Sequence, residues 1–154
     1  MAALTGQALL DHQAKIKRRF EGNKLLAIFM GSIITSTFVN PDNGWETNYW
    51  KLWSKMIPYP DMGGETVRTS YTDNCSDHSL EFFNSWEWLM EVVLMLESLG
   101  HQVLIKNCSC DISGPDYSIG KSYLGAISLE EARRLKLETT WEALVEYITL
   151  LNSK

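Results

Sequence analysis

The pattern of hydrophobic and polar positions is clearest between residues 80 and 107, LEFFNSWEWLMEVVLMLESLGHQVLIKN. Asn84 and Ser85 are both good helix N-caps, and Gly100 stands where a helix would give way to a left-handed residue. With Asn84 as the cap, Glu87 would complete a capping box. The stretch between these signals is almost entirely apolar, so we expect a helix that is packed on much of its circumference. The pattern predicts a strand over 80–83, a helix over 86–99 and a strand over 101–105.

The remaining elements follow from helix caps, apolar spacing and turn residues. Helices are predicted over 5–20, 24–30 and 128–136, followed by a last helix that starts after Thr139. Glu21-Gly22-Asn23 is expected to separate the first two, while Ser128 with Glu131 and Thr139 with Glu142 form two capping boxes. Further strands are predicted over 32–39, 65–72 and 122–127, with a turn at 40–44 and an irregular segment over 108–121.

A length of 154 residues, of which 45% are hydrophobic and 21% charged, suits one globular domain spanning 1–154. We expect an α+β fold with about four mostly antiparallel strands and helices on both faces of the sheet. Six Trp residues are unusual for this length, and Trp beyond the needs of a core often lies at a ligand or partner surface.

The charge is unevenly distributed. The chain carries a net charge of -5, but residues 15–24 hold five Lys or Arg against one Glu. An acidic body with a single basic segment argues against general nucleic-acid binding. The basic run is either the solvated C-terminal end of a helix, where the macrodipole favours cations, or a patch that meets an acidic partner or a phosphate-bearing ligand.

Membrane and secretion signals are not found in the sequence. No run of 18 apolar residues occurs, and residues 1–6 lack the basic start and apolar centre of a signal peptide. Three cysteines, an odd number, do not make a secreted disulfide framework. We therefore expect a cytoplasmic protein that does not bind membranes.

Three segments carry a resemblance to a known family: NKLLAIFMG at 23–31, SWEWLMEVVLMLESLGHQV at 85–103 and TTWEALVEYITLLN at 139–152. In order and spacing the chain resembles the phage ABA sandwich domain of small bacteriophage and prophage proteins. The resemblance implies a three-layer α/β/α sandwich and a phage protein acting in an infected bacterial host, and it implies no activity. Residues 1–22, an N-terminal helical extension, and 108–138, a variable insert, depart from the family pattern and are where an individual function is expected.

The aromatic segment 45–59 is the strongest candidate for a binding site. Three Trp, two Tyr and two Lys beside a Pro-Gly loop could stack a base or anchor a protein partner. The alternative is that these rings simply cover one face of the sheet. For a nucleotide ligand, basic residues elsewhere would meet the phosphates. The candidate ligand-binding residues are Trp45, Tyr49, Trp50, Trp53, Tyr59, Lys121, Ser122 and Arg133.

Two sets of side chains could hold a metal. Cys75, His78, Cys108 and Cys110 have partly suitable zinc spacing, although buried or incidental thiols are the commoner state of such residues. Acidic residues in loops could bind a divalent cation, but scattered surface carboxylates are much more frequent. These acidic residues are Asp61, Glu65, Asp73 and Asp77. We expect no metal and no other cofactor.

Catalytic signatures are weak. The three histidines and three cysteines lie in no nucleophile motif. Gly120-Lys121-Ser122 matches the end of a phosphate-binding P-loop, but Pro115 stands where that motif requires glycine. The loop could still help bind an anion through its amides and Lys121.

These observations favour a binding protein over an enzyme. Our leading hypothesis is a phage-encoded protein that counteracts host defence by sequestering a host protein or a nucleotide immune signal, an inference from presumed origin. One alternative is a small metal-dependent nucleotide hydrolase that uses the acidic loops. Another is an oligomer-forming interaction module whose aromatic face is buried in a homodimer.

Overall fold

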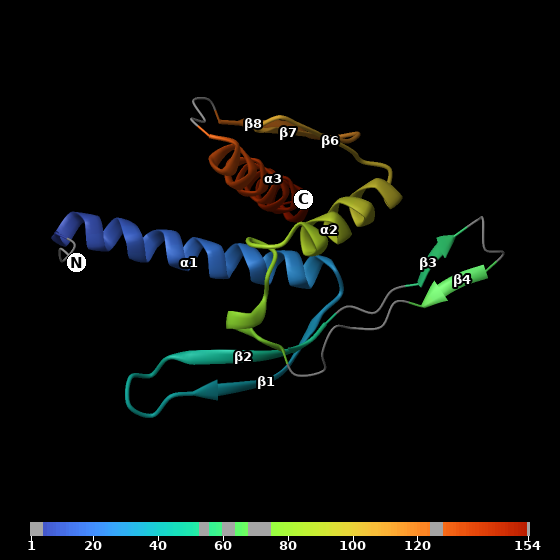
Figure 1. Ribbon diagram of the computed structural model, residues 1–154. Coiled ribbons are helices and arrows are strands. Elements are labelled where there is room, and N and C mark those ends of the chain that lie inside the picture. The colour runs from blue at the N-terminus through green and yellow to red at the C-terminus, as the bar shows by residue number, and fades with distance from the viewer. Residues whose placement is uncertain (1–4, 53–55, 60–63, 68–74, 124–127, 154) are drawn as a thin grey trace.

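The computed structural model describes residues 5–52, 56–59, 64–67, 75–123 and 128–153, with the backbone alone at 56–59 and 64–67. Figure 1 shows the arrangement of the helices and strands in this part of the chain. The helices are α1 (Gly6–Phe29), α2 (Trp86–Ser98), α3 (Leu129–Asn152) and a short 3-10 helix, η2 (Asp77–Ser79). The strands are β1 (Ile33–Val39), β2 (Glu46–Lys51), β3 (Met56–Tyr59), β4 (Gly64–Val67), β5 (Cys75–Ser76), β6 (Gln102–Lys106), β7 (Ser109–Ser113) and β8 (Ser118–Ser122).

These strands form three antiparallel sheets, in the orders β1-β2-β5, β3-β4 and β6-β7-β8. The mixed α+β class is therefore confirmed. More strands form than the sequence predicted, largely because 108–121, expected to be irregular, contains β7 and all but the last residue of β8. These two strands are joined by a short turn in which the Gly114 N–H donates to the Tyr117 carbonyl. Gly114-Pro115-Asp116 are residues typical of turns, and here they connect the two strands of a hairpin.

The helices and sheets lie in successive layers. In Figure 1 the β6–β8 sheet lies on α3, α1 and α2 lie on the other side of α3, and the β1–β2 hairpin lies beyond α1. Alternation along β7 agrees, since Cys110 and Ile112 are buried and Asp111 between them is exposed. On the outer face Leu104 is exposed, and none of the helices described here covers it. The three-layer α/β/α arrangement thus stays a prediction.

The core joins all three helices to both three-stranded sheets. α2 begins and ends nearly as its sequence predicts: Ser85 is the N-cap and accepts from the Trp88 N–H, and Gly100 adopts a φ of 92° after the helix. Its Leu89, Val92 and Leu96 are fully buried. The strand predicted over 80–83 is wrong, because the chain there leaves η2 and forms a turn. Burial of Leu80 and Phe82 anchors this loop, which explains the apolar run.

α1 is continuous where the sequence predicted a break at Glu21-Gly22-Asn23. Gly22 lies under the indole of Trp141 in α3, and a Cβ added there would be 2.3 Å from the Trp141 Cζ2 atom. The buried Asn23 side chain donates to the Leu80 carbonyl at 3.0 Å and accepts from Trp141 Nε1 at 2.9 Å. Both residues serve close packing between α1 and α3, so their poor helix propensity is overridden by tertiary contacts.

α3 is likewise one helix where two were predicted. Ser128 caps it as expected and accepts from the Glu131 N–H at 3.1 Å. The second capping box is wrong: Thr139 is buried inside the helix and its hydroxyl donates to the Leu135 carbonyl at 2.6 Å. A threonine hydroxyl can cap a helix, but inside a helix it can also bond a carbonyl one turn back, so the sequence alone did not separate these states.

Candidate functional site

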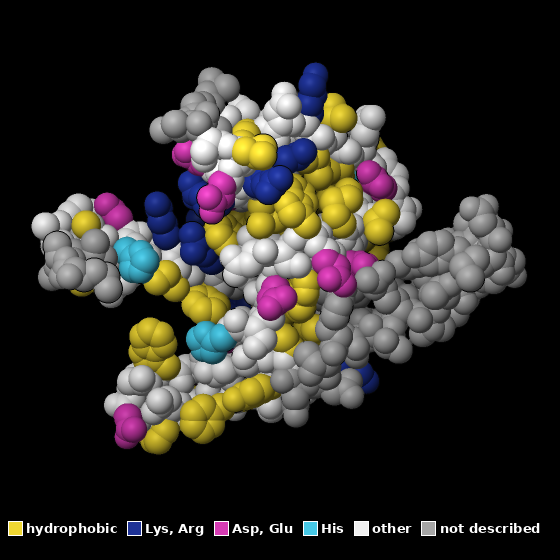
Figure 2. Space-filling model, in the orientation of Figure 1, with side chains coloured by type: hydrophobic (Ala, Val, Ile, Leu, Met, Phe, Trp, Pro, Cys, Tyr) yellow, Lys and Arg dark blue, Asp and Glu magenta, His cyan; other side chains and the backbone are white. Residues whose placement is uncertain are grey.

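A groove separates α1 from the β1–β2 hairpin. The N-terminal part of α1, residues 6–19, is exposed almost throughout and projects from the body in the same direction as the hairpin (Figure 1). Figure 2 shows the hollow between them, with hydrophobic and histidine side chains along its rims. Its volume is about 780 Å³. It is lined by Leu9, His12, Gln13, Ile16, Lys17, Phe20, Glu21, Lys24, Trp45, Glu46, Thr47, Asp77 and His78.

One wall is a helical stripe on α1. Leu9, Ile16 and Phe20 recur with His12 between them, at the three- and four-residue steps that place side chains on one helix face. In most surface helices such a stripe packs on the core, whereas here Leu9 and Ile16 remain exposed. The sequence contained this stripe, but its exposure depends on how far α1 projects from the body.

The other wall comes from the hairpin and from η2. The predicted turn at 40–44 is observed: the Asn40 side chain accepts from the Asp42 N–H, and Gly44 adopts a φ of 73°. Trp45 follows this turn and lies at the opening of the groove, where 71% of its surface is exposed. Deeper in, the His78 ring meets the Phe20 ring edge to face, with centroids 5.0 Å apart.

A buried carboxylate holds the two walls together. Asp77, only 4% exposed, accepts from the Trp50 Nε1–H at 2.6 Å and from the Asn48 backbone N–H at 2.9 Å. Lys24 of α1 lies 3.7 Å from the same carboxylate. Asp77 therefore links η2 to β2 and to α1, which fixes the position of the hairpin. Its carboxylate is occupied by donors of the protein, as expected for a buried charge.

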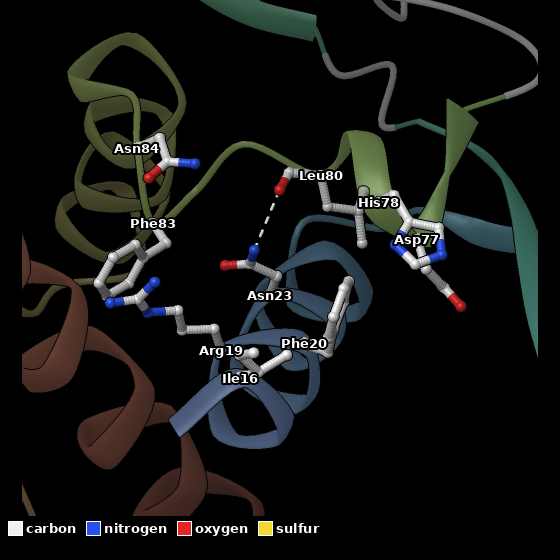
Figure 3. Close-up of a pocket in the computed structure, with 9 residues that line it drawn as sticks. All are labelled: Ile16, Arg19, Phe20, Asn23, Asp77, His78, Leu80, Phe83 and Asn84. Atoms are coloured by element: carbon white, nitrogen blue, oxygen red, sulfur yellow. Dashed lines mark hydrogen bonds between the residues drawn. The ribbon is translucent and has the colours of Figure 1, made fainter. Parts of the chain in front are cut away.

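A second, smaller cavity of about 190 Å³ adjoins the groove and shares Ile16, Phe20, Asp77 and His78 with it (Figure 3). It is completed by Arg19, Asn23, Leu80, Phe83 and Asn84. The Arg19 guanidinium lies 4.0 Å above the centre of the Phe83 ring. Phe83 in turn meets the buried Trp141 edge to face at 5.1 Å. Sequence reasoning missed this cavity, because its residues are distant in the chain.

The residues of the aromatic segment 45–59 do not lie together at one surface. Trp45 lines the groove and Tyr49 is half-buried in β2, whereas Trp50 is 1% exposed and belongs to the core. Trp53 lies outside the described residues, as does the side chain of Tyr59 in β3. Covering the sheet thus accounts for Trp50, and Trp45 is the member that the structure places at an accessible site.

The predicted phosphate-binding residues lie elsewhere in the molecule. Lys121 is on β8, where it pairs with Glu146 of α3 at 2.6 Å, and Ser122 follows it on the same strand. Arg133 is exposed on α3. The sheet that holds β8 lies on the opposite side of α3 from the hairpin (Figure 1), so these residues are not brought to Trp45.

The basic run of α1, by contrast, does border the groove, and most of it is neutralised locally. Lys17 lies 4.0 Å from Glu21, and Arg18 lies 3.9 Å from Glu142 of α3. With Lys24 bound to Asp77, three of the five cations have carboxylate partners. Arg19 stacks on Phe83 instead.

The candidate zinc ligands are not brought together. Cys75 is on β5 and His78 in η2, while Cys110 is on β7 of the other sheet. Cys108, just before β7, donates its thiol to the Ala132 carbonyl at 3.6 Å. The described part of the chain contains no group of three or more His, Cys, Asp or Glu that could hold a metal ion. Asp61 and Asp73 lie outside the described residues, as does the Glu65 side chain.

Burial sets the chemistry of two of the thiols. It raises the pKa of Cys110 to about 12, and it also raises the pKa of Cys75, with the nearby carboxylates of Glu81 and Asp77 adding to the effect. A thiol is nucleophilic as its thiolate. Both side chains are therefore protonated at neutral pH and suit packing better than catalysis.

Comparison of the chain with family models, with curated proteins and with solved structures found no match in any of the three. The resemblance to the phage ABA sandwich domain therefore stays a prediction. Among the described helices, none combines the length and the apolar character needed to cross a bilayer.

Proposed function

We propose that this chain is a non-catalytic binding protein and that the groove between α1 and the β1–β2 hairpin holds a segment of a partner protein. The observation that carries the proposal is the groove itself, with exposed apolar side chains on both of its walls. Leu9 and Ile16 of α1 line one wall, and Trp45, just before the hairpin's second strand, lines the other. The buried Asp77 contacts hold the walls in place before any partner arrives, which reduces the ordering cost of binding.

Exposed apolar side chains also occur outside the groove on the same elements. More than half of the exposed large hydrophobic residues described lie on α1, on β1 or at Trp45, although these segments are a minority of the chain. Where such side chains form a contiguous patch, the patch often marks an interaction surface. The residues are Leu9, Leu10, Ile16, Ile28, Ile33, Ile34, Phe38, Val39 and Trp45.

The groove suits a protein segment better than a nucleotide. Lys17 and Lys24 are within ion-pair distance of carboxylates, and Glu21 and Glu46 also line the groove. A polyphosphate would require several cations without such partners. An aromatic and aliphatic lining instead favours bulky apolar side chains, as in grooves that accept short partner segments.

The further expectation that the partner is a bacterial host protein, bound to counteract defence, rests on the resemblance to phage proteins. A metal-dependent hydrolase is less consistent with the site. Asp77, the one acidic loop candidate whose side chain is described, is buried and already accepts two hydrogen bonds. Lys24 also lies 3.7 Å from this carboxylate, so its charge already has a cationic partner within the protein.

The proposal is tested with a groove variant carrying Ile16→Ser and Trp45→Ser. Both side chains are exposed, so the fold should be retained. Leu104→Ser is the matched control, because Leu104 is exposed on β6 and lines neither cavity. A protein captured from bacterial lysate by the wild type and the control, purified and titrated, should bind the groove variant at least about tenfold more weakly. Trp50 is unsuitable for this purpose because it is part of the core.

Three results would overturn the proposal. The groove variant could retain full affinity for every captured protein. A nucleotide could raise the melting temperature of the wild type but not of the groove variant, which would change the ligand class. Sizing chromatography could show a dimer that the groove variant abolishes, in which case a second copy of the chain occupies the groove.

A further inference from the structure

We infer that the partner carries an aspartate or glutamate next to its apolar anchors, and that this carboxylate binds in the small cavity at Arg19. The inference rests on the proposed function and specifies the partner for the same site. The cavity opens beside the groove and shares four lining residues with it. At about 190 Å³ it is smaller than the roughly 300–1,000 Å³ typical of whole-ligand sites, so a single side chain suits it better.

Arg19 is held in a conformation suited to binding a carboxylate. Its guanidinium lies over the face of Phe83 at 4.0 Å, and Phe83 is itself supported by the ring of Trp141. Trp141 is fixed by its hydrogen bond to Asn23. A guanidinium that stacks through its face keeps its N–H groups at its edge, where they can form two parallel hydrogen bonds to a carboxylate.

The charges around this cavity favour an anion. Asp77 also lines it, but Figure 3 shows the Asp77 side chain turned away from Arg19, and its oxygens accept from Trp50 and Asn48. His78 and the Asn84 amide also line the cavity. Within the described residues no carboxylate is recorded within ion-pair distance of Arg19, although Lys17, Arg18 and Lys24 on the same helix each have one.

The interpretation of the basic run as the C-terminal end of a helix is wrong, because α1 continues to Phe29 and residues 15–24 lie inside it. Lys17 and Arg18 are exposed and lie near surface carboxylates. Arg19, in contrast, is ordered against an aromatic ring at the edge of a cavity. In a chain of net charge -5, a local cation of this kind attracts an acidic segment that the rest of the surface repels.

The experiment uses the full chain and a phage-displayed library of random peptides as the probe. Peptides enriched on the wild type are synthesised and titrated by fluorescence anisotropy. We expect them to contain Asp or Glu within a few positions of bulky apolar residues. Changing the peptide's acid to its amide, or making Arg19→Gln, should each weaken binding roughly tenfold or more, and the two changes together should weaken it little further.

Two control variants separate loss of the carboxylate contact from a general change in charge. Lys15→Gln removes a charge from the same helix at a position that lines neither cavity. It should change the affinity by less than about threefold, because only a long-range attraction that salt screens is lost. Arg19→Lys keeps the charge but loses the paired N–H groups, so it should bind nearly as weakly as Arg19→Gln.

The outcomes separate the two proposals. If enriched peptides bind through the groove but lack an acidic residue, or if acid and Arg19 changes are additive, the carboxylate site is wrong and the groove proposal stands. If Ile16→Ser with Trp45→Ser leaves every enriched peptide bound at full affinity, or if no peptide is enriched, the groove proposal fails and the carboxylate site fails with it.

Discussion

Removing the Asp77 carboxylate should undo the attachment of the hairpin to α1. Asp77→Ala leaves the Trp50 indole N–H and the Asn48 backbone N–H without an acceptor, and Trp50 is almost fully buried. A hydrogen bond to a charged group contributes about 1.5–3 kcal/mol, so the loss of two predicts a destabilisation of about 3–6 kcal/mol. That is a large part of the roughly 5–15 kcal/mol that stabilises a typical domain. The nearby Lys24, whose side chain is 35% exposed, adds little.

The assay is urea denaturation followed by far-ultraviolet circular dichroism, combined in a double-mutant cycle with Trp50→Phe. In the Trp50→Phe background one of the two donors is already gone, so Asp77→Ala should cost about 1.5–3 kcal/mol less than it does in the wild type. The volume lost with the indole is common to both members of that pair and cancels. Hydrogen exchange adds a local readout, because the Asn48 amide loses its own acceptor and should lose more protection than amides of β7, which reflect only the change in global stability.

Either of two results would refute this reasoning. A loss of less than about 1 kcal/mol in Asp77→Ala would mean that water replaces the carboxylate and that Asp77 does not hold the hairpin. Additive costs in the cycle would mean that the 2.6 Å contact to Trp50 contributes nothing specific. In both cases the width of the groove would have to be set by other contacts.

Three further predictions concern other positions. Gly22→Ala should destabilise the fold by about 1–2 kcal/mol in urea denaturation, because crowding against Trp141 outweighs the gain in helix propensity, and a more stable variant would contradict this. Burial raises the pKa of Cys110 to about 12, against 9.0 in the unfolded chain. Above pH 9 the thiol ionises in the unfolded state but not in the folded state, so the free energy of unfolding should fall by roughly 1 kcal/mol per pH unit between pH 9 and 11 and should show no such effect well below pH 9. Cys110→Ala should show a shallower alkaline decline, and equal slopes would refute the assignment. Trp45→Ala, at an exposed site, should change stability by less than about 0.5 kcal/mol in the same assay.

Local signals in the sequence were sufficient where an element depends on its own residues. The helix over 86–98 was predicted almost to its ends because Ser85 caps it and Gly100 follows it in a left-handed conformation. The turn at 40–44 and the strand before it were predicted for similar reasons, since Asn and Gly meet the backbone needs of a turn with their own atoms. The α+β class followed from the mixture of helical and alternating patterns.

Contacts between distant residues decided the rest. Gly22 and Asn23 resemble a helix break in sequence, and only the presence of Trp141 against them explains an unbroken α1. Thr139 could cap a helix or sit inside one, and packing chose the interior. The candidate site also depends on contacts between residues that are distant in the chain. The sequence contained an aromatic segment and a basic run. It did not show that Trp50 is buried against Asp77 or that Arg19 stacks on Phe83. Both contacts join residues that are distant in the chain, so they form only when α1, η2 and the hairpin pack together.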